Sequence, residues 1–281
     1  NMLRIQLQKI QEAMDKIRRN ALNYSIEDYE QILNENMTAI SDTKHKFMEY
    51  RRVVRNRVKE LEDENINIKA LSDEDMEKIS QIYIVACGSA YHVGMVAQYV
   101  IEDLAKIPVR VELASEFRYR KPLLDKNGLV IVVSQSGETA DSLAALREAK
   151  EKGIRTLGIV NVVGSSIARE ADNVFYTLAG PEISVATTKA YSTQLIASYV
   201  LAIQLAKVKG QIDEEQYSAY VEELKTLPEK IKKIIEDKER IQWFAAKQAN
   251  AKDIFFVGRG IDYAICMEGS LKMKEISYIH S

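Results

Sequence analysis

Five short runs of mostly apolar residues, separated by stretches with helical spacing, constrain the fold of this chain more than any other feature. Each run is five or six residues long, which fits a strand buried on both faces of a parallel sheet. Helical stretches at 93–104 and 142–152 lie between the runs. This alternation predicts an α/β fold with a doubly wound parallel sheet. The expected strands are 82–87, 109–113, 129–133, 156–160 and 174–178.

The residues that precede these runs have a different character. The first glycine is Gly88 and the first proline is Pro108, so both strong helix breakers are missing before residue 88. Apolar residues recur there at helical spacing, and we expect residues 1–70 to form a helical hairpin arm. The arm serves either for packing or dimerisation, or as a helix-turn-helix DNA reader. The near balance of acidic and basic residues favours the first interpretation.

A second copy of the strand-then-glycine pattern begins near residue 253. The stretch 253–260 repeats the pattern of 82–88, and a helix is expected to follow at 261–277. We therefore divide the chain into the arm, a first α/β domain at 71–212, and a helical connection with the start of a second unit at 213–281. The helices expected between the two units are 189–207, 214–237 and 238–250.

The start of a second unit leaves an apolar strand, expected at 254–257, without neighbouring strands. Exposed strand edges invite association with other chains. We therefore expect this strand to pack on a second copy of the chain or on the arm. A homodimer is the expected assembly.

Charge balance and residue counts exclude several classes of protein. The 281 residues include 39 Lys and Arg against 41 Asp and Glu, so no basic surplus is available to bind a nucleic acid. We find neither an apolar run of about 20 residues nor a signal peptide, and we expect a cytoplasmic protein. Two Cys and three His are too few for a disulfide framework or a structural zinc site. We expect no metal and no other cofactor.

One loop carries the residue types of a phosphate site. It follows the expected strand 129–133 and offers the hydroxyls of Ser134, Ser136 and Thr139, the amide of Gln135 and the flexible Gly137. Such a loop, at the carboxyl end of a parallel strand and before a helix, can surround one anion with side-chain and backbone donors. On composition alone a plain helix cap explains the same residues. The P-loop pattern that ends in Gly-Lys-Ser/Thr is absent.

Two further turns precede expected helices. Cys87, Gly88 and Ser89 follow the first strand, and Val185 and Thr187 precede the helix at 189–207. Both turns fit a ligand site at the carboxyl edge of the sheet. An ordinary strand-to-helix turn explains the first equally well, and a helix N-cap explains the second.

Lys272 and Glu275 lie three residues apart in an expected helix, and thus on one face of it. A surface ion pair is the simpler interpretation. The functional interpretation is a carboxylate that moves a proton on a carbon next to a carbonyl, with an ammonium group beside it that handles hydroxyl protons.

Five longer strings make the region from about residue 82 to 281 resemble a known family. The resemblance is to the sugar isomerase (SIS) part of the glucosamine-6-phosphate synthases, the glutamine:fructose-6-phosphate amidotransferases. Other SIS proteins share the serine-rich loop, but the second and fifth strings are particular to this family. The strings are ACGSAYHVG (86–94), ASEFRYR (114–120), SQSGETADS (134–142), VATTKAYSTQL (185–195) and EGSLKMKEISYIHS (268–281).

The resemblance implies a site for fructose 6-phosphate or glucosamine 6-phosphate. Glu275 would move the proton between C1 and C2 of the opened sugar, and Lys272 would assist at a hydroxyl. Ser89 and Thr187 replace Thr and Ser of the family and keep the hydroxyl. The phosphate ligands would be Ser134, Gln135, Ser136 and Thr139, and the sugar would be lined by Cys87, Gly88, Ser89, Val185 and Thr187.

The family's ring-opening His, substrate Lys and glutaminase domain have no match in this sequence. We therefore expect the isomerase part of such an enzyme, incomplete in this chain. A non-catalytic sugar-phosphate-binding SIS module is the alternative, and another SIS isomerase or deglycase is a third.

Overall fold

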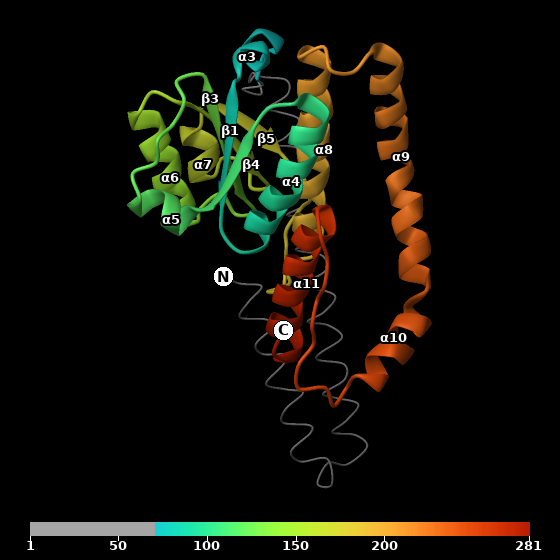
Figure 1. Ribbon diagram of the computed structural model, residues 1–281. Helices are drawn as coiled ribbons and strands as arrows, with labels where there is room; N and C mark the ends of the chain where they lie inside the picture. The colour runs from blue at the N-terminus through green and yellow to red at the C-terminus, as the bar shows by residue number, and fades with distance from the viewer. Residues whose placement is uncertain (1–70) are drawn as a thin grey trace, which may run out of the picture. The chain divides into compact units, whose positions relative to one another are not determined.

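The computed structural model describes residues 71–281, and the arm expected at 1–70 lies outside them (Figure 1). The described residues belong to one compact unit. Among their helices, none combines the length and apolar character needed to span a membrane.

A five-stranded parallel sheet organises this unit, in the order β2-β1-β3-β4-β5. The order reverses between β1 and β3, because the chain adds β2 on one side of β1 and the later strands on the other. β3 is buried along its whole length. The strands are β1 (Gln81–Ala86), β2 (Val109–Leu113), β3 (Gly128–Ser134), β4 (Arg155–Val160) and β5 (Asn173–Tyr176).

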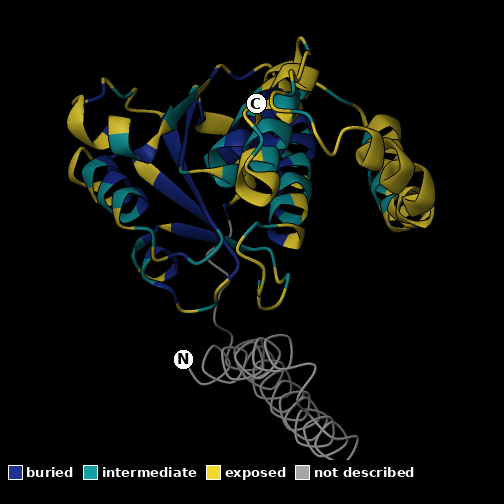
Figure 2. Cartoon of the chain, turned by 90° about the horizontal axis from the view of Figure 1, so that it is seen from below, coloured by how far each residue is buried: buried dark blue, intermediate teal, exposed yellow. Residues whose placement is uncertain are grey.

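Helices cover both faces of the sheet, so the predicted doubly wound α/β fold is confirmed (Figure 1). Apolar side chains of one strand face pack with α3 (Asp73–Lys78), α4 (Ser89–Ala105) and α8 (Lys189–Val208). Those of the other face pack with α5, α6 and α7. Figure 2 shows the resulting core as buried strands between half-buried helices. The second set of helices is α5 (Ala114–Tyr119), α6 (Ala140–Glu151) and α7 (Ser166–Glu170).

The sequence located all five of these strands to within two residues. It did not predict the short helices α3, α5 and α7, because five or six residues are too few to show a helical period. β5 ends at Tyr176, two residues before the expected end, since the backbone turns to a positive φ of 49° at Leu178.

The strand expected at 254–257 is wrong. These residues join no sheet, and an isolated bridge between Asp253 and His280 is the pairing that the structure shows beside them. A strand needs a neighbour for its backbone N–H and C=O groups, and the described residues supply none here. Phe255 and Val257 are consequently exposed. The expected packing of this segment on a second copy or on the arm stays a prediction.

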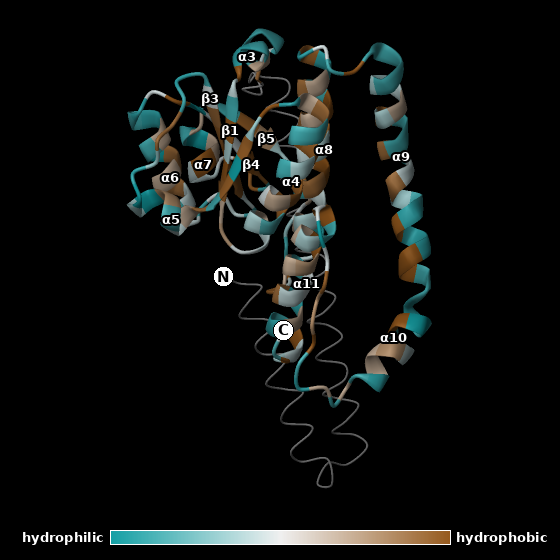
Figure 3. Cartoon of the chain, viewed as in Figure 1, coloured by the Kyte–Doolittle hydropathy of each residue, from teal (hydrophilic) through white to brown (hydrophobic). Residues whose placement is uncertain are grey.

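Two helices after the sheet lie apart from its core (Figure 1). They are α9 (Glu214–Glu236), which Asp213 opens with a capping box, and α10 (Lys238–Lys247). Neither contains a buried residue, and Figure 3 shows apolar positions along both. The division expected at residue 212 falls between α8 and α9 and stays a prediction. The chain then returns through α11 (Ile261–Ser277), which packs against α4.

Candidate functional site

The reversal of strand order brings two of the predicted loops together. β1 and β3 are neighbours, with Ala86 opposite Val133, so the turn after β1 and the loop after β3 leave the same edge of the sheet. In open parallel sheets, ligands bind at this place, outside the carboxyl ends of the strands where the order reverses. Cys87 Sγ lies 3.9 Å from Ser142 Oγ on α6 and so joins the two segments.

The hydroxyls of Ser134 and Thr139 in the 134–139 loop face each other, and neither caps the helix. Ser134 Oγ lies 3.2 Å from Thr139 Oγ1 and accepts the backbone N–H of Gly137 at 3.0 Å. Thr139 is the N-cap residue of α6, yet its side chain makes no capping hydrogen bond. The helix-cap interpretation of this loop is therefore wrong. Ser136 Oγ accepts the backbone N–H of Glu138 at 3.2 Å.

Gly137 allows the loop to turn closely over its neighbour. Its φ is +66°, and a Cβ built on it would come within 2.5 Å of the Cβ of Ser165. Two backbone hydrogen bonds hold the turn in place. Ile167 N of α7 donates to Gly137 O at 3.0 Å, and Asn161 N, directly after β4, donates to Gln135 O at 3.2 Å. Backbone contacts thus fix the positions of the hydroxyls.

Glu138 also attaches the 134–139 loop to the start of α7. Its Oε1 accepts the backbone N–H of Ser166 at 2.8 Å. The hydroxyl and backbone N–H of Ser166 hold the pKa of the Glu138 carboxyl below its usual range. Glu138 is therefore a support of the loop, which its place in the sequence string did not reveal.

The turn before α4 presents Gly88 and Ser89 at the start of a helix. Gly88 has a φ of +56° and is the N-cap residue of α4, and the structure gives it no side-chain cap. The first N–H groups of a helix have no partner within the helix, and such groups can bind an anion.

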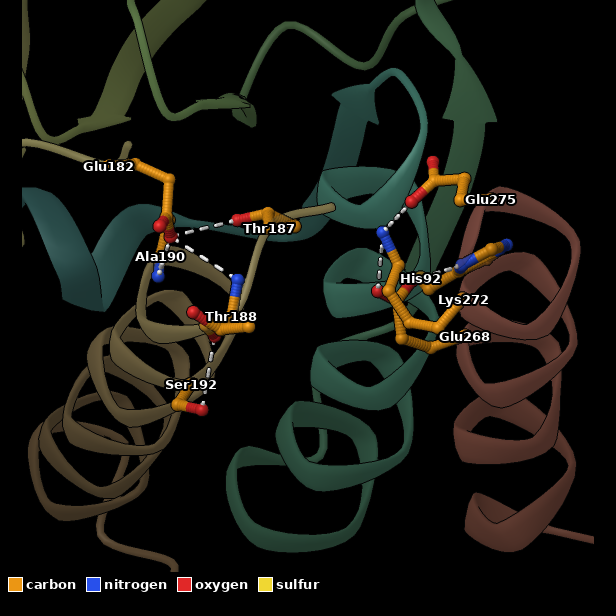
Figure 4. A network of polar contacts seen from close by, with 9 residues as sticks. All are labelled: His92, Glu182, Thr187, Thr188, Ala190, Ser192, Glu268, Lys272 and Glu275. Atoms are coloured by element: carbon orange, nitrogen blue, oxygen red, sulfur yellow. Dashed lines mark hydrogen bonds and ion pairs between the residues drawn. The ribbon is translucent and has the colours of Figure 1, made fainter. Parts of the chain in front are cut away.

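The segment before α8 is organised by a carboxylate that the sequence did not indicate. Glu182 Oε2 accepts hydrogen bonds from Thr187 Oγ1 at 3.3 Å and from the backbone N–H groups of Thr188 and Ala190 at 3.2 and 3.1 Å (Figure 4). Burial raises the pKa of Glu182, but these hydrogen bonds outweigh it and leave the pKa below its usual range.

Among the hydrogen bonds of residues 71–281, none joins Val185 or Thr187 to the 134–139 loop. Val185 is fully exposed. The N-cap residue of α8 is Thr188, whose side chain makes no capping hydrogen bond, and Glu182 accepts the N–H groups of the first turn instead. The only sequence signal for Glu182 is an acidic residue shortly before a helix start.

Lys272 and Glu275 belong to a longer polar chain on α11. Glu268, Lys272 and Glu275 share one face of the helix, and Lys272 Nζ pairs with Glu275 Oε2 and lies 3.5 Å from Glu268 Oε1. Glu268 Oε2 lies 2.7 Å from Nδ1 of His92 on α4. Figure 4 shows the four side chains in sequence between the two helices. The pair is more than a surface ion pair, because Glu268 is buried.

The charge of Glu268 also affects the pKa of Tyr191 on α8. Burial raises the pKa of Tyr191 to about 12, and the Glu268 carboxylate is the second cause. Sequence reasoning assigned no role to His92, Glu268 or Tyr191. A histidine within the apolar helix 89–105, and a glutamate one turn before Lys272, were the available signals.

Comparisons with known proteins show which proteins this chain is similar to. A family model described as the SIS domain matches residues 75–204 and 248–281. The glutamine-fructose-6-phosphate aminotransferase (isomerizing) of Clostridium tetani is 58% identical over 223 residues, which are 79% of this chain and 36% of that protein. The protein of the same name from Caldanaerobacter subterraneus is 59% identical over 218 residues, 78% of this chain and 35% of that protein. The chain thus spans about a third of these relatives.

A solved structure has a similar fold. The C-terminal domain of glucosamine-fructose-6-phosphate aminotransferase from Francisella tularensis superposes with a TM-score of 0.73 at 42% identity. The match covers 75% of this chain and 61% of that domain.

Proposed function

The chain belongs to the SIS-domain family, and from this premise we propose that it is the sugar-phosphate isomerase part of a glutamine-fructose-6-phosphate aminotransferase. Its substrates would be fructose 6-phosphate and ammonia, and its products glucosamine 6-phosphate and water. The observation that carries this proposal is the pair of hydroxyls of Ser134 and Thr139, which lie 3.2 Å apart where the strand order reverses.

The phosphate is assigned to this loop because an anion needs convergent donors. Ser134, Gln135, Ser136 and Thr139 supply hydroxyl and amide donors, and Gly137 lets the backbone approach closely. Neutral donors in a fixed loop suit a phosphate that must be both bound and released.

The sugar is assigned to the segments beside the loop. Gly88 and Ser89 present a helix start next to the 134–139 loop, and Cys87 connects the two through Ser142. Val185 and Thr187 would line the sugar from the segment before α8. Support for these two residues comes from the family resemblance and from the hydroxyl of Thr187, held near the start of α8 by Glu182.

Glu275 and Lys272 are assigned to the reacting carbons. Moving a proton between C1 and C2 of an open-chain sugar requires a base that later returns the proton, and a carboxylate can do both. The ammonium group of Lys272, paired with Glu275, would stabilise negative charge that develops on the neighbouring oxygen.

Calorimetric titration with glucosamine 6-phosphate tests the proposal, with glucosamine as the control ligand. We expect saturable binding of the phosphorylated sugar, and binding of glucosamine weaker by at least about tenfold, because the loop contacts only the phosphate. Equal affinity for the two sugars, or no binding of either, would contradict the proposal.

We also propose that the chain forms a homodimer, supported by exposed apolar side chains on α9 and α10 such as Ile234, Trp243 and Phe244. Such faces favour association. We expect a sedimentation mass of twice 31.9 kDa at micromolar concentration, and a mass of 31.9 kDa would contradict the dimer. Two free thiols, Cys87 and Cys266, support a reducing compartment, and we propose the cytoplasm.

A further inference from the structure

We propose that His92 is a positioning residue, which acts through Glu268 to hold Lys272 and Glu275 against the sugar. This inference rests on the function proposed above. His92 lies on α4, in the first α/β domain, whereas the two groups assigned to the reacting carbons lie on α11.

The polar chain has a buried end and an exposed end. The exposed fraction is 10% for the side chain of His92 and 8% for Glu268, and it rises to 21% for Lys272 and 37% for Glu275. The chain therefore begins inside the contact between α4 and α11 and ends at the surface, where a ligand can reach it.

Both oxygens of Glu268 are occupied. Oε2 faces Nδ1 of His92 at 2.7 Å and Oε1 faces Nζ of Lys272 at 3.5 Å. An ionised carboxylate only accepts hydrogen bonds, so Nδ1 of His92 is the donor. Since a buried charge without a partner is unstable, this bond fixes the orientation of Glu268.

The orientation of Glu268 in turn limits where Lys272 can lie. Lys272 is a flexible side chain with a single charged end, and it is held between Glu268 and Glu275. Without His92, Glu268 is free to rotate, and Lys272 loses one of its two fixed partners. Tyr91 contacts the ring of His92 edge-on at 5.8 Å between centroids, which keeps the imidazole in place.

The test compares two substitutions of the same residue. His92→Asn keeps an N–H donor at the position of Nδ1, whereas His92→Leu keeps the volume and removes the donor. The dissociation constants of glucosamine 6-phosphate and of inorganic phosphate are measured for each variant by calorimetry. Ser198→Ala, which removes a buried hydroxyl of α8 bonded only within its own helix, is the matched control.

We expect His92→Leu to lose about tenfold of the preference for glucosamine 6-phosphate over inorganic phosphate, the loss that one hydrogen bond to a charged group represents. The affinity for inorganic phosphate itself should not change, because the 134–139 loop is untouched. His92→Asn and Ser198→Ala should keep the wild-type preference.

Three outcomes overturn the inference. The first is an unchanged preference in His92→Leu, the second a parallel loss of affinity for both ligands, and the third a failure of His92→Asn to restore the preference. Should His92→Leu not fold, Glu268→Gln replaces it, and the same loss of preference is expected. Absence of binding by the wild-type chain is a different result, which overturns the proposed function together with this inference.

Discussion

The Gly137→Ala variant should lose both the binding of glucosamine 6-phosphate and about 3–5 kcal/mol of stability. Alanine at a φ of +66° costs about 1–2 kcal/mol by itself. The larger part comes from the new Cβ, which would lie within 2.5 Å of the Cβ of Ser165. Ser165 is buried, so the loop must move, and the hydroxyls of Ser134 and Thr139 move with it.

Gly153→Ala is the matched control for this variant. Gly153 has a similar φ of +71° in the turn after α6, and a Cβ there would meet nothing within 4 Å. We expect it to lose only about 1–2 kcal/mol in urea unfolding, the cost of the backbone conformation, and to bind the ligand normally. Equal losses in the two variants would show that crowding against Ser165 is unimportant.

The double variant Ser134→Ala with Ser136→Ala should weaken the binding of glucosamine 6-phosphate by more than about a hundredfold. Each substitution removes a hydroxyl that would donate a hydrogen bond to the charged phosphate. Each such bond contributes about 1.5–3 kcal/mol to the binding free energy. Calorimetry measures the affinity of the folded variant, and its thermal midpoint separates lost binding from lost folding.

A second double variant provides the comparison. Ser218→Ala with Thr226→Ala removes two hydroxyls from the exposed helix α9, where Thr226 bonds only to Glu223 of its own helix. It should bind as the wild-type chain does. Unchanged affinity in the variant that lacks the Ser134 and Ser136 hydroxyls would contradict the assignment of the phosphate to this loop.

The sheet was predictable from sequence because its strands are buried on both faces. A run such as 129–133 needs no partner to be recognised, since continuous apolar character already indicates a parallel strand. The same reasoning failed at 254–257, where the local pattern is equally apolar but no neighbouring strand is present among residues 71–281. Local pattern predicts the tendency of a segment, and pairing decides the outcome.

The loop of the candidate site was predictable, and its supports were not. Ser134, Ser136 and Thr139 stand within six residues of sequence, and the hydroxyls of Ser134 and Thr139 do lie together. Glu182 contacts residues five to eight positions later, and its signal was only an acidic residue shortly before a helix start. His92 acts through a contact 176 positions away in sequence, which spacing does not predict. The assigned roles of Lys272 and Glu275 stay predictions, although the structure does place these two side chains together.

His92 and Glu268 are separated by 176 positions in sequence, which has a consequence for how the protein is made. The sheet, with its 134–139 loop, uses residues that leave the ribosome early, and domains fold as they emerge. α11 is synthesised much later and must close a long loop to reach α4, at an entropic cost that grows with loop length. A nascent chain can therefore present a formed 134–139 loop before Lys272 and Glu275 exist, so under the proposed function the site would bind phosphate before it could transfer a proton.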